Sequence, residues 1–192
     1  CIRDRAWSGR EEPAKAPEQQ AWSGTEDFGG AEGAAGLHDN WDDPDGYYRV
    51  MLGEKLQQRY QIFAILGRGI FATVVRARDL QQNGREVAIK IARRQETMYK
   101  AGMKEISILQ RLSEADPDNK MFIVHFFSHF EHRGHLCMVF ESLGLNLREI
   151  VKRFGKDVGL NLQAVKTYTK QMLLALALLR EKQFVHADIK PD

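Results

Sequence analysis

The residue types best suited to chemistry lie in the run His-Ala-Asp-Ile-Lys-Pro-Asp at residues 186–192. A carboxylate and an ammonium group two residues apart can serve phosphoryl transfer. The carboxylate can accept the proton of an attacking hydroxyl, and the ammonium can neutralise phosphate charge. We therefore assign catalytic roles to Asp188 and Lys190. The alternative is an ordinary turn whose charged side chains are solvated.

A second candidate group is the run Gly-Arg-Gly-Ile-Phe-Ala-Thr-Val at residues 67–74. Glycines let a backbone approach phosphates closely, and the backbone N–H groups supply donors. Dinucleotide-binding folds use a similar spacing but need a helix directly after the loop. The β-branched residues that follow here disfavour a helix start, so we predict a hairpin over a nucleotide rather than a dinucleotide-binding loop. The alternative is an ordinary glycine-containing hairpin turn. Its nucleotide-contacting residues would be Gly67, Arg68, Gly69, Ile70, Phe71, Ala72, Thr73 and Val74.

The third group combines a strand lysine with a helix glutamate. In Val-Ala-Ile-Lys at residues 87–90, strand alternation places Ala88 and Lys90 on one face. A small Ala88 leaves room there for a flat ring, and Lys90 can reach phosphate oxygens. Isolated lysines and glutamates are usually solvated, so the argument depends on their order in the chain. Glu105 follows on a predicted helix, and an ion pair with Lys90 would hold the lysine at the phosphates.

Hydrophobic patterning predicts the elements that position these residues. The order is strand, strand, strand, helix, strand, strand, helix, helix and loop, which indicates an α+β fold with a small antiparallel sheet first. The last helix, beginning near Asn161, has so broad an apolar stripe that we expect it to be buried against other helices. The predicted strands are 60–66, 73–78, 86–91, 123–130 and 136–140, and the helices lie around 103–112, 146–154 and 161–179.

Composition divides the chain near residue 46. Residues 1–46 contain 11 acidic and 4 basic side chains, seven of the 16 glycines and few aliphatic residues. Such a segment cannot bury enough apolar area to offset its ordering entropy. We predict a disordered acidic leader at 1–46, an N-terminal extension at 47–59 and the main domain at 60–192. Two cysteines are too few for a disulfide framework, which favours an intracellular protein, and no apolar run is long enough for a membrane span.

Two other kinds of site are weighed against the same residues. Four histidines and one cysteine between residues 125 and 137 raise the possibility of zinc. Their spacing along two strands and a turn does not converge, so packed or solvated histidines are the better interpretation. The basic residues of the main domain are scattered without interleaved aromatic residues, so we expect no direct nucleic-acid binding.

These motifs together resemble the eukaryotic protein kinase family over about residues 60–192. Several stretches are similar to one branch, the pre-mRNA-processing-four kinases of the CMGC group. Most kinases have Arg at the position of Ala187, and this branch resembles the present chain in having Ala. The stretches that carry the resemblance are residues 45–50, 135–141, 146–149, 155–160 and 186–192.

The resemblance implies a protein-kinase-like fold and a serine/threonine kinase that uses ATP and Mg²⁺. Its substrates would be spliceosomal proteins, and it would be nuclear and monomeric. By the family pattern, Asp188 would orient the attacking hydroxyl and Lys90 would hold the α and β phosphates. The adenine pocket would be formed by Leu66, Val74, Ala88, Phe140 and the backbone of Glu141 and Leu143.

Two departures from the family pattern shape the expected activity. With Ala187 no arginine is available to pair with a phosphorylated activation loop, so activation would not rely on that contact. The metal-binding Asn, the Asp-Phe-Gly metal site and the activation loop would follow Asp188 and are not found there, so no metal ligand is assigned in this chain. We expect a fragment with a complete small lobe and the first helices of the large one. The helix from Asn161 would normally pack into the missing part of the large lobe, so the fragment should lose part of that burial, be marginally stable and aggregation-prone, and be inactive alone. The alternative is a non-catalytic nucleotide-binding or scaffold module for spliceosomal partners.

Overall fold

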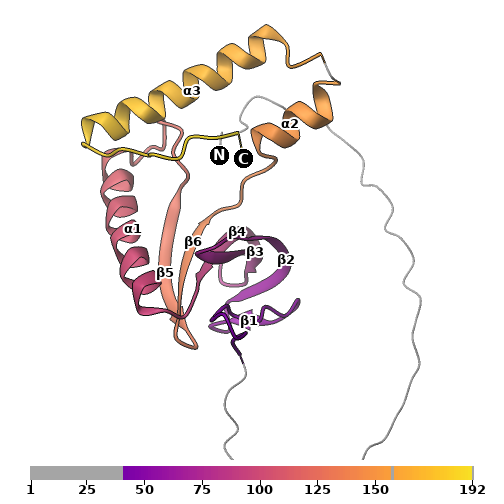
Figure 1. Cartoon of the computed structure of the whole chain (residues 1–192), viewed down its shortest axis with the longest axis vertical. Helices are drawn as coiled ribbons and strands as arrows, with labels where there is room; N and C mark the ends of the chain where they lie inside the picture. Colours follow the sequence, from indigo (N-terminus) through magenta and orange to yellow (C-terminus); the bar gives the residue numbers. More distant parts are fainter. Residues whose placement is uncertain (1–40, 157, 192) are drawn as a thin grey trace, which may run out of the picture.

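The computed structural model describes residues 41–156 and 158–191. Within them lie a six-stranded antiparallel sheet and three helices (Figure 1). The strands run in the order β1-β2-β3-β4-β6-β5, so the predicted α+β class is confirmed. The strands are β1 (Lys55–Leu56), β2 (Tyr60–Arg68), β3 (Ala72–Asp79), β4 (Arg85–Ala92), β5 (Phe126–His132) and β6 (His135–Glu141), and the helices are α1 (Glu96–Ala115), α2 (Leu147–Phe154) and α3 (Leu162–Glu181).

One face of the sheet forms the main core. Val75, Ile89 and Val139 are opposite one another on β3, β4 and β6 and are almost completely buried. Residues directly opposite on neighbouring strands share a face, so the alternation seen in the sequence becomes a continuous apolar layer. The β3–β4 connection spans residues 80–84 and ends in a turn at Asn83 and Gly84, whose φ values are +52° and +73° and across which the N–H of Arg85 donates to the carbonyl of Gln82 at 2.9 Å.

Helix α1 covers the opposite face beside β5 and β6 (Figure 1). Its Ile106 packs with Leu136 and Met138 of β6 in a second buried cluster. Gly102 makes this close approach possible, because an added Cβ would lie 2.6 Å from a methyl group of Leu136. The helix that carries Glu105 is therefore held tightly against the strand that pairs with β4.

Residues 41–46, which we expected to belong to the leader, are described and contact the sheet. Trp41 packs against the main core and lies under the guanidinium of Arg133 at 3.1 Å. Asp42 forms an isolated antiparallel bridge with Tyr48. The contacts of the Trp41 ring and of the paired carboxylates in this segment offset the conformational entropy that is lost when the segment becomes ordered. The rest of the predicted leader, residues 1–40, lies outside the described residues.

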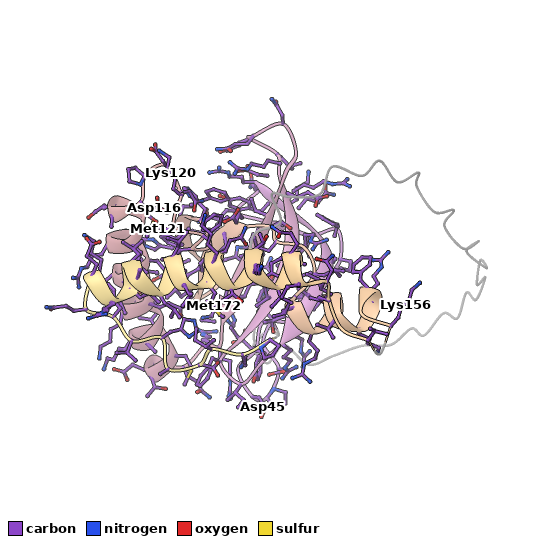
Figure 2. All side chains as sticks on the ribbon, turned by 90° about the horizontal axis from the view of Figure 1, so that it is seen from above. Asp45, Asp116, Lys120, Met121, Lys156 and Met172 are labelled. Carbon is purple, nitrogen blue, oxygen red and sulfur yellow. The ribbon has the colours of Figure 1, made fainter. Side chains whose placement is uncertain are left out.

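Helix α3 is covered only in part by the other described elements. Seen from above, it crosses the molecule between α1 at one end and α2 at the other (Figure 2). It buries Leu178 and Gln171, but Leu162, Val165 and Leu173 are 68%, 43% and 59% exposed. The broad apolar stripe of this helix is therefore buried only in part, as expected for a helix that would normally pack into further helices of the large lobe. The stripe has apolar side chains on more of the helix surface than the neighbouring described elements cover.

Candidate nucleotide-binding and catalytic site

The glycine-rich residues form a tight hairpin between β2 and β3. The N–H of Gly69 donates to the carbonyl of Ala72 at 2.9 Å and closes the turn. Ile70 and Phe71 at the tip are 73% and 63% exposed, while Ala72 and Thr73 are buried. The predicted hairpin is thus present, and no helix follows it. This excludes the local geometry that a dinucleotide-binding loop needs.

The strand register places several predicted adenine and phosphate residues on one face. Lys90 is opposite Val74 on β3 and Met138 on β6. Ala88 is opposite Phe140 on β6. Since opposite residues share a face, Val74, Ala88, Lys90 and Phe140 lie together on the side covered by α1. Leu66 is half exposed and falls in a register shift between Ile65 and Gly67, so the register does not assign it to this face.

Lys90 forms an ion pair with Glu105 of α1. Its Nζ donates to Oε1 and Oε2 of Glu105 at 2.8 and 2.7 Å. The two side chains are 28% and 41% exposed, so the pair is partly solvated. This contact fixes the direction of a flexible lysine on the face that carries Val74 and Ala88. The role of Lys90 in holding phosphates stays a prediction.

The segment after β6 has a feature that the sequence analysis missed. Arg76, on the same face as Ala88, donates from Nη2 to the carbonyl of Leu143 at 3.2 Å. Its Nε is buried and has no hydrogen-bond partner within the described residues. The N–H of Glu141 donates to the carbonyl of His125 at 2.9 Å. In the sequence, Arg76 is one of several scattered basic residues. Only the pairing of β3 with β4, which sets Arg76 opposite Ala88, could have shown that it lies on this face of the sheet.

The candidate catalytic residues lie in the irregular segment after α3. Nζ of Lys190 donates to Oδ2 of Asp188 at 2.9 Å, and both side chains are largely exposed. The N–H of Asp188 donates to Nδ1 of His186 at 3.3 Å, across Ala187 in the left-handed region at φ +61°. The carbonyl of Pro191 accepts from the N–H of Arg148 at the start of α2 at 3.0 Å. Figure 1 shows this yellow segment returning along α3 toward α2.

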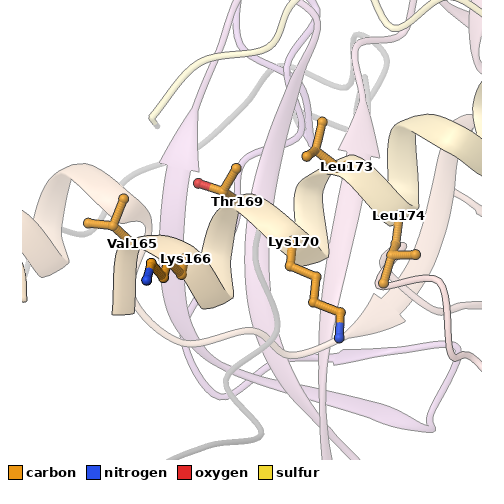
Figure 3. A pocket seen from close by; sticks show the side chains of 6 residues that line it. All are labelled: Val165, Lys166, Thr169, Lys170, Leu173 and Leu174. Atoms are coloured by element: carbon orange, nitrogen blue, oxygen red, sulfur yellow. The ribbon is translucent and has the colours of Figure 1, made fainter. Parts of the chain in front are cut away.

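A shallow hollow of about 430 Å³ occurs elsewhere, on the surface of α3 (Figure 3). None of the predicted site residues lines it. It is lined by Val165, Lys166, Thr169, Lys170, Leu173 and Leu174, all of which are exposed except the partly buried Leu174. It follows from the uncovered apolar stripe of the helix rather than from the glycine hairpin or Asp188.

The histidines considered for zinc have separate partners. His135 is fully buried, with Nδ1 2.8 Å from the carbonyl of Ala92 and Nε2 2.7 Å from Oδ1 of Asp42. His132 contacts the hydroxyl of Tyr48, and His125 contacts Asn119. In the described part of the chain, no group of three or more His, Cys, Asp or Glu side chains could hold a metal ion. Likewise, no described helix is long and apolar enough to cross a membrane.

A curled antiparallel sheet with one helix, whose glutamate pairs with a strand lysine beneath a glycine hairpin, is the small lobe of a protein-kinase-like fold. The chain belongs to the protein kinase family: the family model described as protein kinase domain matches residues 60–192. The predicted family and fold are therefore confirmed.

Several relatives are similar over most of the chain. The serine/threonine-protein kinase prp4 of Schizosaccharomyces pombe is 53% identical over 158 residues, which cover 82% of this chain and 33% of that protein. The serine/threonine-protein kinase prpf4B of Dictyostelium discoideum is 45% identical, covering 81% of this chain and 19% of its own length. The serine/threonine-protein kinase SRPK of Physarum polycephalum is 41% identical, covering 77% and 35%. The similarity to the pre-mRNA-processing-four branch is confirmed, and the chain spans about a third or less of the length of the first two relatives.

Proposed function

We propose that the protein is an ATP-dependent protein serine/threonine kinase linked to pre-mRNA splicing. The observation that carries the proposal is the Lys90–Glu105 ion pair on the sheet face shared by Val74, Ala88 and Phe140. The relatives named above are serine/threonine-protein kinases, among them prp4 and SRPK. Spliceosomal proteins as substrates and a nuclear location form part of the same proposal.

The residues of the chain divide the chemistry among them. Backbone N–H groups of the glycine hairpin receive the phosphates, and Lys90 is directed toward their oxygens by Glu105. Asp188 accepts the proton of the attacking serine or threonine hydroxyl, and Lys190 beside it neutralises phosphate charge. Mg²⁺ supplies charge neutralisation when it is bound with ATP. By the family pattern its ligands are an Asn and an Asp-Phe-Gly aspartate that would follow Asp192.

ATP affinity of the 192-residue chain tests the nucleotide site. Lys90→Met should weaken ATP binding by about tenfold or more, because a hydrogen bond to a charged group contributes about 1.5–3 kcal/mol. Lys100→Met is the matched control, because Lys100 pairs with Glu96 on the exposed surface of α1. Equal ATP affinities for the wild type and Lys90→Met, measured by calorimetric titration, would reject the site.

Catalysis requires a separate experiment. We propose that residues 1–192 bind ATP without phosphotransfer and that activity returns when the downstream half of the S. pombe prp4 kinase domain is joined after Asp192. In this chimera Asp188→Asn should reduce phosphate transfer to a serine peptide by about 100- to 10,000-fold. Nucleotide binding with no transfer by the chimera would favour the non-catalytic scaffold instead.

A further inference from the structure

The segment before the domain contacts the tip of the glycine hairpin directly. We name residues 42–47 the strap. The hydroxyl of Tyr47 donates to the carbonyls of Gly69 and Ile70 at 2.9 and 3.0 Å. Tyr47 is 9% exposed, so the contact is nearly closed to water. The strap lies outside residues 60–192, which the family model matches.

Two arginines enclose the Tyr47 ring. The guanidinium of Arg68, within the glycine hairpin, lies 3.7 Å from the ring centroid, and that of Arg93 lies 4.6 Å from it. Arg68 also donates to Oδ2 of Asp43 at 2.7 Å. The other oxygen of Asp43 accepts from the N–H groups of Asp45 and Tyr47 at 3.0 and 2.9 Å. The Asp43 carboxylate therefore stabilises the turn within the strap and also binds Arg68 of the hairpin.

Arg93 extends the contact to the strand that carries Lys90. It follows Lys90 by three residues, and its N–H donates to the carbonyl of Phe71 at 3.1 Å. Its side chain donates to the carbonyl of Ile70 at 3.2 Å and to that of Asp45 at 3.0 and 2.6 Å. The strap, the hairpin tip and the end of β4 are thus one hydrogen-bonded unit. Asp45 itself lies at the outer rim of the molecule (Figure 2).

The strap has its own attachment to the sheet. Oδ1 of Asp42 contacts Nε2 of the buried His135, and the N–H of Arg94 donates to the carbonyl of Gly46 at 2.8 Å. Gly46 has a φ of +79°, which a side chain would strain. These bonds do not involve residues 67–74. The strap is therefore attached to the sheet independently of the hairpin that it contacts.

We propose that the strap is a positioning element for the phosphate-binding hairpin, with Tyr47 as its main contact. The proposal rests on the proposed ATP site. A hairpin whose tip is so exposed would lose conformational freedom when it closed over phosphates. The strap removes part of that freedom before the nucleotide arrives and so raises affinity by preorganisation. Adenosine has no phosphates, so its binding does not depend on the strap.

The test compares ATP and adenosine binding by the 192-residue chain. Tyr47→Phe keeps the ring between the two guanidinium groups but removes the hydroxyl. It should weaken ATP binding by about fivefold, the effect of one ordinary hydrogen bond, and leave adenosine binding unchanged. Hydrogen exchange of residues 67–74 should rise in the same variant. Tyr99→Phe is the matched control: it removes the exposed hydrogen bond from Tyr99 of α1 to Glu131 of β5 and should bind both ligands as the wild type does.

Asp43→Asn is the second variant and carries the test if Tyr47→Phe fails to fold. Asn retains the oxygen that accepts from Asp45 and Tyr47 but removes the charge that Arg68 contacts. It should also weaken ATP selectively. ATP affinities equal to the wild type in both variants, or equal losses for ATP and adenosine, would overturn the strap proposal while leaving the ATP site intact. A wild-type chain that binds neither ligand would reject the ATP site, and the strap proposal with it.

Discussion

Replacement of Glu105 by Gln separates the structural role of the ion pair from its proposed role in nucleotide binding. Gln keeps the length of the side chain and one acceptor oxygen but removes the charge that faces Nζ of Lys90 at 2.7 Å. With the two side chains 28% and 41% exposed, the pair should contribute only about 0.2–1 kcal/mol to the free energy of unfolding. The melting temperature should therefore fall by no more than about 4 °C.

The effect on ATP should be larger than the effect on stability. Lys90 in the variant keeps one neutral acceptor but loses the ion pair, so it is held less firmly on the sheet face and part of its charge-assisted contact with phosphate is lost. A loss of about 1.4 kcal/mol corresponds to tenfold weaker binding. Calorimetric titration with ATP and thermal melting of the same samples measure both quantities.

Glu96→Gln is the control for this prediction. It breaks the Lys100–Glu96 pair on the same helix, whose side chains are 69% and 79% exposed, and should leave ATP affinity unchanged. The reasoning is refuted if Glu105→Gln binds ATP as tightly as the wild type. It is refuted equally if Glu96→Gln weakens ATP to the same extent.

Two further predictions concern stability and solubility. The buried Asp79 accepts hydrogen bonds from Arg59 at 2.8 and 2.6 Å, and these lower the pKa of its carboxyl below the ordinary value. Its contribution to stability should be complete above about pH 4 and be lost as pH falls through the lowered pKa. Urea denaturation should therefore show that the difference in free energy of unfolding between the wild type and Asp79→Asn becomes smaller below that pH. A difference that becomes larger at acidic pH would contradict this prediction. Leu173→Ser, on the uncovered side of α3, should change the melting temperature by less than about 2 °C because surface substitutions are usually within about 0.5 kcal/mol. Light scattering should show slower aggregation than for the wild type. An unchanged rate would mean that the exposed surface of α3 does not cause the aggregation.

The sequence predicted the sheet well because its strands alternate clearly. In β4 every second residue from Val87 is buried, and the Asn-Gly pair lies in the turn that precedes the strand. The order of the lysine strand and the following helix also indicated the Lys90–Glu105 pair. These features depend on local periodicity and short separations, which a single sequence displays directly.

The contacts of the strap could not be predicted in the same way, and for α3 the sequence pattern alone does not show which side chains are covered. Tyr47 and Gly69 are 22 residues apart, and Asp42 and His135 are 93 apart, so no local pattern signals either contact. Composition placed Asp42 in an acidic leader because a carboxylate looks solvated until its partner is known. For α3, a helical stripe shows which residues are apolar but not whether another element covers them.

The position of Tyr48 bears on where the cooperative folding unit begins. Its ring is 4% exposed, packs in the main core, and meets the rings of His132 and His135 edge to face. A protein trimmed to residue 60, where the match to the family model begins, would uncover that core and also lose the β1 edge strand. The packed core therefore reaches back at least to Trp41, into a stretch that the 158-residue similarity to the S. pombe prp4 kinase also covers.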